Sequence, residues 1–169
     1  IRHAQAFVKK NKKKILEIGT SRGRVTAMLA TVGCHVTTID HQDRGAQQNL
    51  EGLSVKVVQQ DAIAFLMSSS ETFDLIVVDL HGNTPEDWQG LYKPLLSRLS
   101  SKGSIVINNA ILYEIPEWKN ETGVQWFLDQ LSSVWRIELY TDNLPGIAVV
   151  SRRSWLSKSM AVIKNVLGK

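Results

Sequence analysis

The chain has 169 residues, 43% of them hydrophobic and 21% charged, with a formal net charge of +4 at pH 7. These values are typical of a globular domain long enough for a full core, and we predict a single domain over residues 1–169. No apolar run approaches the roughly 20 residues that a transmembrane helix needs, and no signal peptide is apparent. The single cysteine, Cys34, excludes an internal disulfide and favours a cytoplasmic location with a buried, inert thiol.

The first predicted element is an apolar strand over residues 14–18, which leads into a loop bracketed by Gly19 and Gly23. A helix over residues 24–32 follows, so a ligand can approach the loop backbone in front of a helix N-terminus. Glu17 stands two residues before the first glycine. A carboxylate at this place favours a cationic ligand without phosphates.

The spacing of the glycines argues against a dinucleotide site. In the fingerprint G-x-G-x-x-G, the second glycine admits the pyrophosphate and the third packs the helix on the sheet. Ser21 and Arg24 occupy those two positions here. A pyrophosphate would therefore meet side chains, and a dehydrogenase is disfavoured.

Strand and helix patterns alternate through the middle of the chain, which predicts an α/β fold with a mostly parallel sheet. Lys102 and Gly103 are predicted to turn the chain into a fifth strand at 104–108. Pro94 is expected to kink or divide the helix in which it stands. The other predicted elements are strands at 35–40, 55–59 and 73–79 and helices at 63–67 and 86–99.

The last third predicts a helix at 123–131 and two strands at 134–140 and 146–152. The connection between these strands is too short for a crossover helix, so they should pair antiparallel. The fold class is thus a Rossmann-like, mostly parallel sheet of seven strands with a C-terminal antiparallel hairpin and helices on both faces.

Four predicted strands end at or next to an acid, namely Glu17, Asp40, Asp61 and Asp79. Ligands of open α/β sheets bind at the carboxyl ends of the strands. Asp40 is placed to accept hydrogen bonds from ribose hydroxyls. Each acid alone is explained as well by a turn or a helix cap, but four in corresponding positions favour one shared site.

These motifs together resemble the class I S-adenosylmethionine-dependent methyltransferases. The resemblance is carried by Glu-Ile-Gly-Thr-Ser-Arg-Gly at 17–23, by Asp79 with His81 two residues later, and by Gly-Val-Gln-Trp-Phe at 123–127. It covers roughly residues 12–153. The most similar groups are the small-molecule O-methyltransferases, both catechol O-methyltransferase-like and cephalosporin- or rhamnosyl-O-methyltransferase-like.

The resemblance implies S-adenosylmethionine as methyl donor, S-adenosylhomocysteine as product, and transfer to an oxygen of a small molecule. Because a sulfonium donor is already activated, the protein has to align an in-line attack and remove a proton from the nucleophile. His81 is the candidate base, with Asp79 beside it, although His81 is explained equally well as a cap of the next helix. The residues expected to bind the cofactor are Glu17, Gly19, Thr20, Ser21, Gly23, Asp40, His41, Asp61, Ala62 and Asp79.

A divalent metal is disfavoured. Metal-dependent relatives combine the strand-four aspartate with an aspartate–asparagine pair after strand five, whereas this chain has Asp79, Asn108 and Asn109. Hard cations prefer charged oxygen ligands, and one carboxylate with two amides should bind magnesium poorly. The catalytic lysine that such relatives carry shortly after the strand-four acid is also missing.

The acceptor is expected to contact aromatic side chains after strands four and five. Trp88, Tyr113 and Trp118 are the candidates, whereas Trp126 and Trp135 fall on periodic faces that predict the core.

Two other functions stay open. A nucleic-acid methyltransferase is suggested by basic residues near both ends of the chain, but of the ribose-methylating Lys-Asp-Lys-Glu set only Lys14, Asp79 and Glu138 are found. A methyltransferase-like module without turnover is the second. The amphipathic segment 155–169 is expected to form a helix that docks on the domain or forms a homodimer, rather than lying on a membrane.

Overall fold

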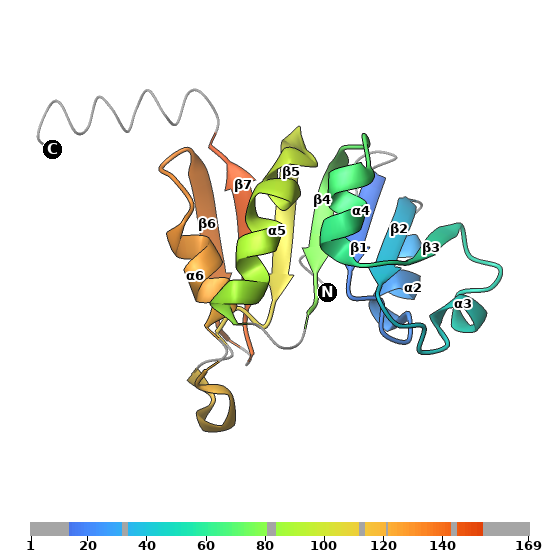
Figure 1. The fold of residues 1–169 in the computed structure, drawn as a ribbon, viewed down its shortest axis with the longest axis horizontal. Helices are drawn as coiled ribbons and strands as arrows, with labels where there is room; N and C mark the ends of the chain where they lie inside the picture. Colours follow the sequence, from blue (N-terminus) through green and yellow to red (C-terminus); the bar gives the residue numbers. More distant parts are fainter. Residues whose placement is uncertain are drawn as a thin grey trace, which may run out of the picture.

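The computed structural model describes residues 14–31, 34–80, 84–111, 114–120, 122–142 and 145–153. Within them, seven strands form one sheet in the order β3-β2-β1-β4-β5-β7-β6 (Figure 1). The strands are β1 (Lys14–Ile18), β2 (His35–Asp40), β3 (Val55–Gln59), β4 (Phe73–Val78), β5 (Leu99–Asn108), β6 (Trp135–Tyr140) and β7 (Ile147–Arg152). The helices are α2 (Arg24–Ala30), α3 (Ala46–Asn49), α4 (Ala62–Ser68), α5 (Pro85–Ser97) and α6 (Gly123–Asp129), with a 3₁₀ turn, η2 (Pro116–Trp118).

The first five strands run parallel, and β7 pairs antiparallel with both β5 and β6. The predicted fold class is therefore confirmed, including the terminal hairpin. Each helix predicted within the described ranges ends within two residues of its observed bounds, while the short helix α3 has no counterpart in the prediction. The helix predicted over 155–169 lies outside the described residues. Pro94 lies inside α5 without dividing it.

Strand β5 differs from its prediction, because it begins at Leu99 rather than at Ser104. Leu99 pairs with Phe73 and Ser104 pairs with Leu75, so residues 100–103 bulge out opposite the single residue Asp74. The Ser100 hydroxyl donates to Asp74 Oδ1 over 3.0 Å and holds this bulge on β4. The turn predicted at Lys102 and Gly103 is thus a bulge within the strand.

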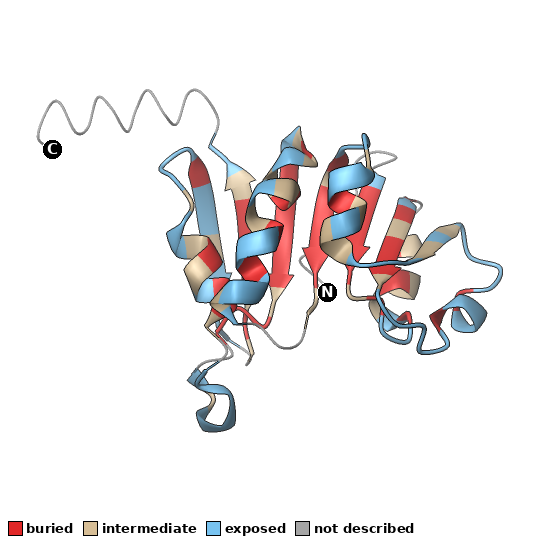
Figure 2. Ribbon diagram, in the orientation of Figure 1, coloured by how far each residue is buried: buried red, intermediate tan, exposed pale blue. Residues whose placement is uncertain are grey.

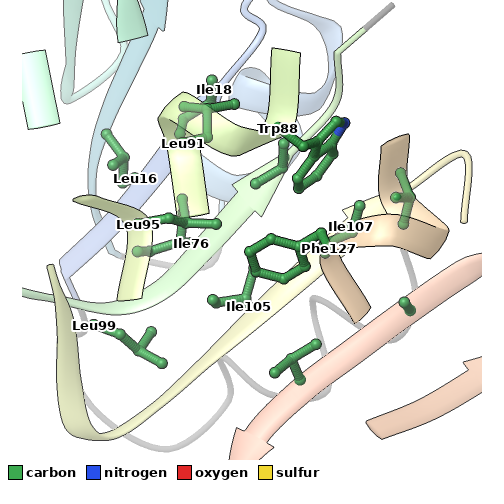
Figure 3. Packing of buried hydrophobic residues seen from close by; sticks show 14 of the residues in the cluster. Leu16, Ile18, Ile76, Trp88, Leu91, Leu95, Leu99, Ile105, Ile107 and Phe127 are labelled. Carbon is green, nitrogen blue, oxygen red and sulfur yellow. The ribbon is translucent and has the colours of Figure 1, made fainter. Parts of the chain in front are cut away.

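The apolar side chains of the sheet divide between its two faces, and the central strands are buried along their length (Figure 2). One face packs against α4, α5 and α6, where Trp88 and Phe127 lie 5.1 Å apart between ring centroids (Figure 3). The other face packs Leu29 of α2 together with Cys34 and Val36. The prediction of a buried thiol is confirmed.

The core corrects one prediction about the acceptor. Trp88 was predicted to contact the acceptor, but it is 1% exposed and packs in the core between α5 and α6. The reason is its place on the face of α5 that also carries Leu91 and Leu95. Trp135 lies in the core as predicted, and the partly buried Trp126 packs against the same core cluster. Among the described residues, no helix is long and apolar enough to cross a membrane.

Candidate functional site

A cavity of about 410 Å³ opens at the carboxyl ends of β1 and β2 and the starts of α4 and α5. Strand order reverses between β1 and β4, and such a switch point is where open α/β sheets bind ligands. The cavity is lined by Ile18, Gly19, Ile39, Asp40, His41, Gln60, Asp61, Ala62, Ile63, Leu80, Glu86, Asp87 and Leu91.

Gly19 lies where three strands end. Its N–H donates to the carbonyl of Ile39 over 2.8 Å, and its φ of +99° lies in the region that favours glycine. A Cβ at this position would lie 2.1 Å from the carbonyl oxygen of Asp79. Only glycine therefore lets the end of β1 pass beside the end of β4.

Asp40 holds the glycine loop from the end of β2. Its Oδ2 accepts the N–H of Ser21 over 2.8 Å, and its Oδ1 accepts the N–H of Gln42 over 3.0 Å. Ser21 has a φ of 50°, and Gly23, with a φ of 84°, donates its N–H back to Thr20. The loop thus wraps around one carboxylate that also lines the cavity.

Glu17 lies beneath this loop rather than in the cavity wall. It is fully buried, and its Oε2 accepts hydroxyl hydrogen bonds from Thr26 and, over 2.5 Å, from Thr38. The hydroxyls of Thr38 and Thr20 lie 2.6 Å apart, which extends the network into the loop. The other carboxylate oxygen of Glu17, Oε1, has no hydrogen-bond partner within the described part of the chain.

Burial dominates the ionisation of Glu17. It raises the pKa of the carboxyl group from 4.5 to about 7, against the two threonine hydrogen bonds and with help from the charges of Asp79 and Asp40. A direct contact between Glu17 and a cofactor stays a prediction.

Asp61 and His41 both line the cavity. Asp61 is also the N-cap of α4, because its Oδ1 accepts the N–H of Ala64 over 2.9 Å. The helix-cap explanation of Asp61 is therefore confirmed, and its contact with a ligand stays a prediction. The His41 side chain is exposed, with Nδ1 3.4 Å from Asp40 Oδ1. Ala62 lines the cavity beside Asp61.

The predicted acceptor side begins where β4 ends, at Asp79. Its Oδ1 accepts the side-chain amide of Asn108 over 2.9 Å, and the amide of Asn109 donates to the carbonyl of Leu80 over 3.2 Å. The Asn108 amide presents a hydrogen to an Asp79 oxygen that a cation would need, and one carboxylate with two amides is a poor donor set for a hard divalent cation. No group of three or more acids, histidines or cysteines in the described ranges is arranged for one either.

Several predicted residues lie elsewhere. His81 and Tyr113 fall outside the described residues. Trp118 is 44% exposed in η2. Lys14 lies at the other end of the sheet, 3.3 Å from Glu71, and is not brought together with Asp79. The partial ribose-methylating set is thus not assembled, which agrees with the sequence argument that disfavoured it.

Eight residues of the cavity wall were not predicted, namely Ile18, Ile39, Gln60, Ile63, Leu80, Glu86, Asp87 and Leu91. Each lies at the end of a strand, just after one, or within the first two turns of a helix. The binding of ligands at strand ends predicts Gln60 and Leu80 as well as the acids.

This architecture, with a glycine loop and a cavity at the switch point, is that of the class I S-adenosylmethionine-dependent methyltransferases. The sequence matches the family described as methyltransferase domain over residues 15–103. The chain belongs to the methyltransferase domain family, and the predicted enzyme class is confirmed. No curated protein matches the sequence.

Crystal structures with the same fold include methyltransferases of different kinds. An O-methyltransferase from Streptomyces achromogenes, involved in tomaymycin synthesis and in complex with SAM, is 20% identical with a TM-score of 0.71, over 90% of this chain and 80% of that one. A SAH-bound methyltransferase from Podospora anserina is 19% identical with a TM-score of 0.73, over 90% and 77%. An rRNA methylase from Streptococcus thermophilus is 16% identical with a TM-score of 0.68, over 90% and 95%. At these identities the likeness shows a shared fold.

Proposed function

We propose that the chain transfers a methyl group from S-adenosylmethionine to an oxygen of a small molecule. The observation that carries this proposal is the position of Asp40, which holds the glycine loop and also lines a cavity at the switch point of the sheet. A carboxylate in this place can accept hydrogen bonds from ribose hydroxyls. Neighbours of the same fold hold SAM or SAH.

The cavity wall suits the other parts of the cofactor. Ile18, Ile39 and Ile63 supply apolar surface for a base, and Asp61 and Gln60 supply polar groups at its edge. The carboxylates of Asp40 and Asp61 favour a cationic ligand. Those of Glu86 and Asp87 at the start of α5 act in the same direction.

The bound cofactor supplies an activated methyl group. What remains for the chain is to align the acceptor oxygen and remove its proton. We assign the proton removal to His81, with Asp79 beside it at the end of β4. Because His81 lies outside the described residues, this role rests on its place in the sequence.

Calorimetric titration with S-adenosylhomocysteine tests the cofactor. We expect binding of this ligand and none of NAD; the reverse result would overturn the proposal. Asp40→Ala should weaken binding roughly 10- to 100-fold, because a charge-assisted hydrogen bond is lost. The matched control is Asp129→Ala, at an exposed acid of α6 remote from the cavity lining.

A binding module without turnover is the second candidate. The observation in its favour is the asparagine pair, with its two amides, at the end of β5. A screen of phenolic and sugar hydroxyls for S-adenosylhomocysteine formation separates the two, since a module binds the cofactor and forms no product. A cytoplasmic location, a single domain over 1–169 and a homodimer through 155–169 remain part of the proposal.

A further inference from the structure

Two consecutive asparagines at the end of β5 bind the end of β4 through their side chains. Asn108 Nδ2 donates to Asp79 Oδ1 over 2.9 Å, and Asn109 Nδ2 donates to the carbonyl of Leu80 over 3.2 Å. The last pair of the β4–β5 ladder is Val78 with Ile107. The two amides therefore continue the pairing of these strands past the point where the backbone ladder ends.

The asparagines are themselves held from the opposite side. Asn108 pairs with Ile147 of β7. The next N–H groups, those of Ala110 and Ile111, donate to the carbonyls of Gly146 and Pro145 over 3.2 and 2.9 Å. The end of β5 is thus fixed to β7 before its side chains reach β4.

Asn109 has a backbone conformation that few residues tolerate. Its φ is 62° and it is 6% exposed. Left-handed conformations are strained for most side chains, and asparagine tolerates them better than others. Such strain persists where the surroundings hold it, often at a functional site. Here the conformation lets the backbone stay on β7 while the side chain turns to β4.

The Asp79–Leu80 turn is held on its other side by β1. The N–H of Asp79 donates to the carbonyl of Ile18 over 2.9 Å, and the carbonyl oxygen of Asp79 faces Gly19 too closely for any side chain there. Leu80 lines the cavity. The turn therefore lies between the glycine loop and the two asparagines, at the wall of the site.

We propose that Asn108 and Asn109 are positioning residues that hold the Asp79–Leu80 turn in place for the cofactor and the acceptor. The proposal rests on the proposed function, because it assigns the turn to that site. The two amides act through Asp79 and Leu80 and contact no ligand themselves. They link the turn to the antiparallel hairpin, which is the most distant part of the sheet from the glycine loop.

The test compares Asn108→Ala, Asn109→Gly and Asn109→Ala in the full chain. Glycine at 109 tolerates the left-handed backbone and lacks the amide. Alanine lacks the amide and is also strained in the left-handed conformation. All three should bind S-adenosylhomocysteine about tenfold more weakly at a temperature where each is folded. Asn109→Gly should lose less thermal stability than Asn109→Ala. Equal losses of affinity with unequal losses of stability would show that the amide positions the turn apart from its effect on folding. Gln125→Ala, at an exposed amide on α6, should change neither value.

Hydrogen exchange at the Asp79 N–H gives a reading that needs no ligand. This N–H should exchange about tenfold faster in Asn108→Ala and Asn109→Gly than in the unmodified chain and in Gln125→Ala. Unchanged exchange together with unchanged affinity would overturn the proposal. If the unmodified chain binds no S-adenosylhomocysteine, the proposed function fails. The exchange rates alone then decide whether the asparagines hold the turn.

Discussion

The ends of β1 and β2 and the ends of β4 and β5 form the two halves of the proposed site, and they are built differently. The first half depends on backbone shape, with Gly19 and Gly23 at positive φ and one carboxylate, Asp40, holding the loop. The second half depends on side-chain amides, which extend from β5 to the turn after β4. Backbone shape requires glycine and so leaves a pattern in the sequence, whereas an amide contact leaves none. The half proposed to bind the cofactor can therefore be predicted from the sequence, whereas the contacts in the half proposed to bind the acceptor cannot.

The largest effect should come from Gly19→Ala, which tests whether backbone shape governs the first half. A Cβ there meets the carbonyl of Asp79 at 2.1 Å, and φ is +99°. We expect a loss of more than about 4 kcal/mol in the free energy of unfolding, with no cofactor binding. Urea unfolding measures it.

Gly45→Ala is the matched control, because Gly45 has a φ of +85° and nothing within 4 Å of an added Cβ. It should cost only about 1 kcal/mol. Equal losses in the two variants would show that φ alone matters and that the strand ends are not in close contact.

Substitutions of three histidines test the two halves separately, through kcat and through cofactor affinity. His81→Asn should lower kcat by roughly 10²- to 10⁴-fold with cofactor affinity unchanged, because it removes the proposed base. His41→Asn should weaken cofactor binding and leave kcat at saturation unchanged, since His41 lines the cavity beside Asp40. His35→Asn, at the exposed start of β2, should change neither. A normal kcat for His81→Asn would contradict the assignment of this histidine as the base.

Glu17→Gln tests the cost of the buried carboxylate beneath the loop. Folding raises the pKa of Glu17 from 4.5 to about 7. The folded state of the unmodified chain is therefore most stable below pH 4.5 and loses stability against the unfolded state as the pH rises through 7. At pH 8 the loss is roughly 3 kcal/mol. The variant, which cannot ionise, should escape it.

Urea unfolding of both proteins from pH 4.5 to 8 measures this difference, which should grow with pH. Glu51→Gln, at an exposed position, should follow the unmodified chain throughout. Parallel curves for Glu17→Gln and the unmodified chain would mean that Glu17 ionises normally in the folded state.

The smallest effect should be that of a chelator. With amide hydrogens directed at Asp79 and Leu80, EDTA should change neither cofactor affinity nor turnover. Asn108→Asp brings a second carboxylate to about the same place, and manganese chloride should then raise the melting temperature of this variant alone. A manganese-dependent shift in the unmodified chain would contradict the amide orientation.

Most of the fold was predictable from hydrophobic periodicity, since buried parallel strands such as β4 are continuous apolar runs and the terminal hairpin follows from a short connection. The bulge at 100–103 was not, because Lys102 and Gly103 suit a turn as well as a bulge and the choice depends on pairing with Asp74. Trp88 was misplaced for a different reason. It lies on the buried face of α5 with Leu91 and Leu95, and this helical spacing indicates a core position that its place after β4 does not.

The site divides in the same way. The structure brings Asp40, Asp61 and Gly19 to one cavity, and all three were marked by strand ends or by glycine. The bonds of Asn108 and Asn109 to the end of β4 were not expected from the sequence, because they join residues 29 positions apart.

The contact between Gly19 and Asp79 also bears on how mutational scans of this chain are interpreted. Substitutions at position 19 will be as poorly tolerated as those of a catalytic residue. The cause is the close approach of the backbone of Gly19 to that of Asp79. Substitutions at Ile63 and Leu80, whose side chains line the cavity, test ligand recognition more directly. A scan scored by growth alone would rank Gly19 above Ile63 and Leu80, although the latter two are more informative for the design of ligands.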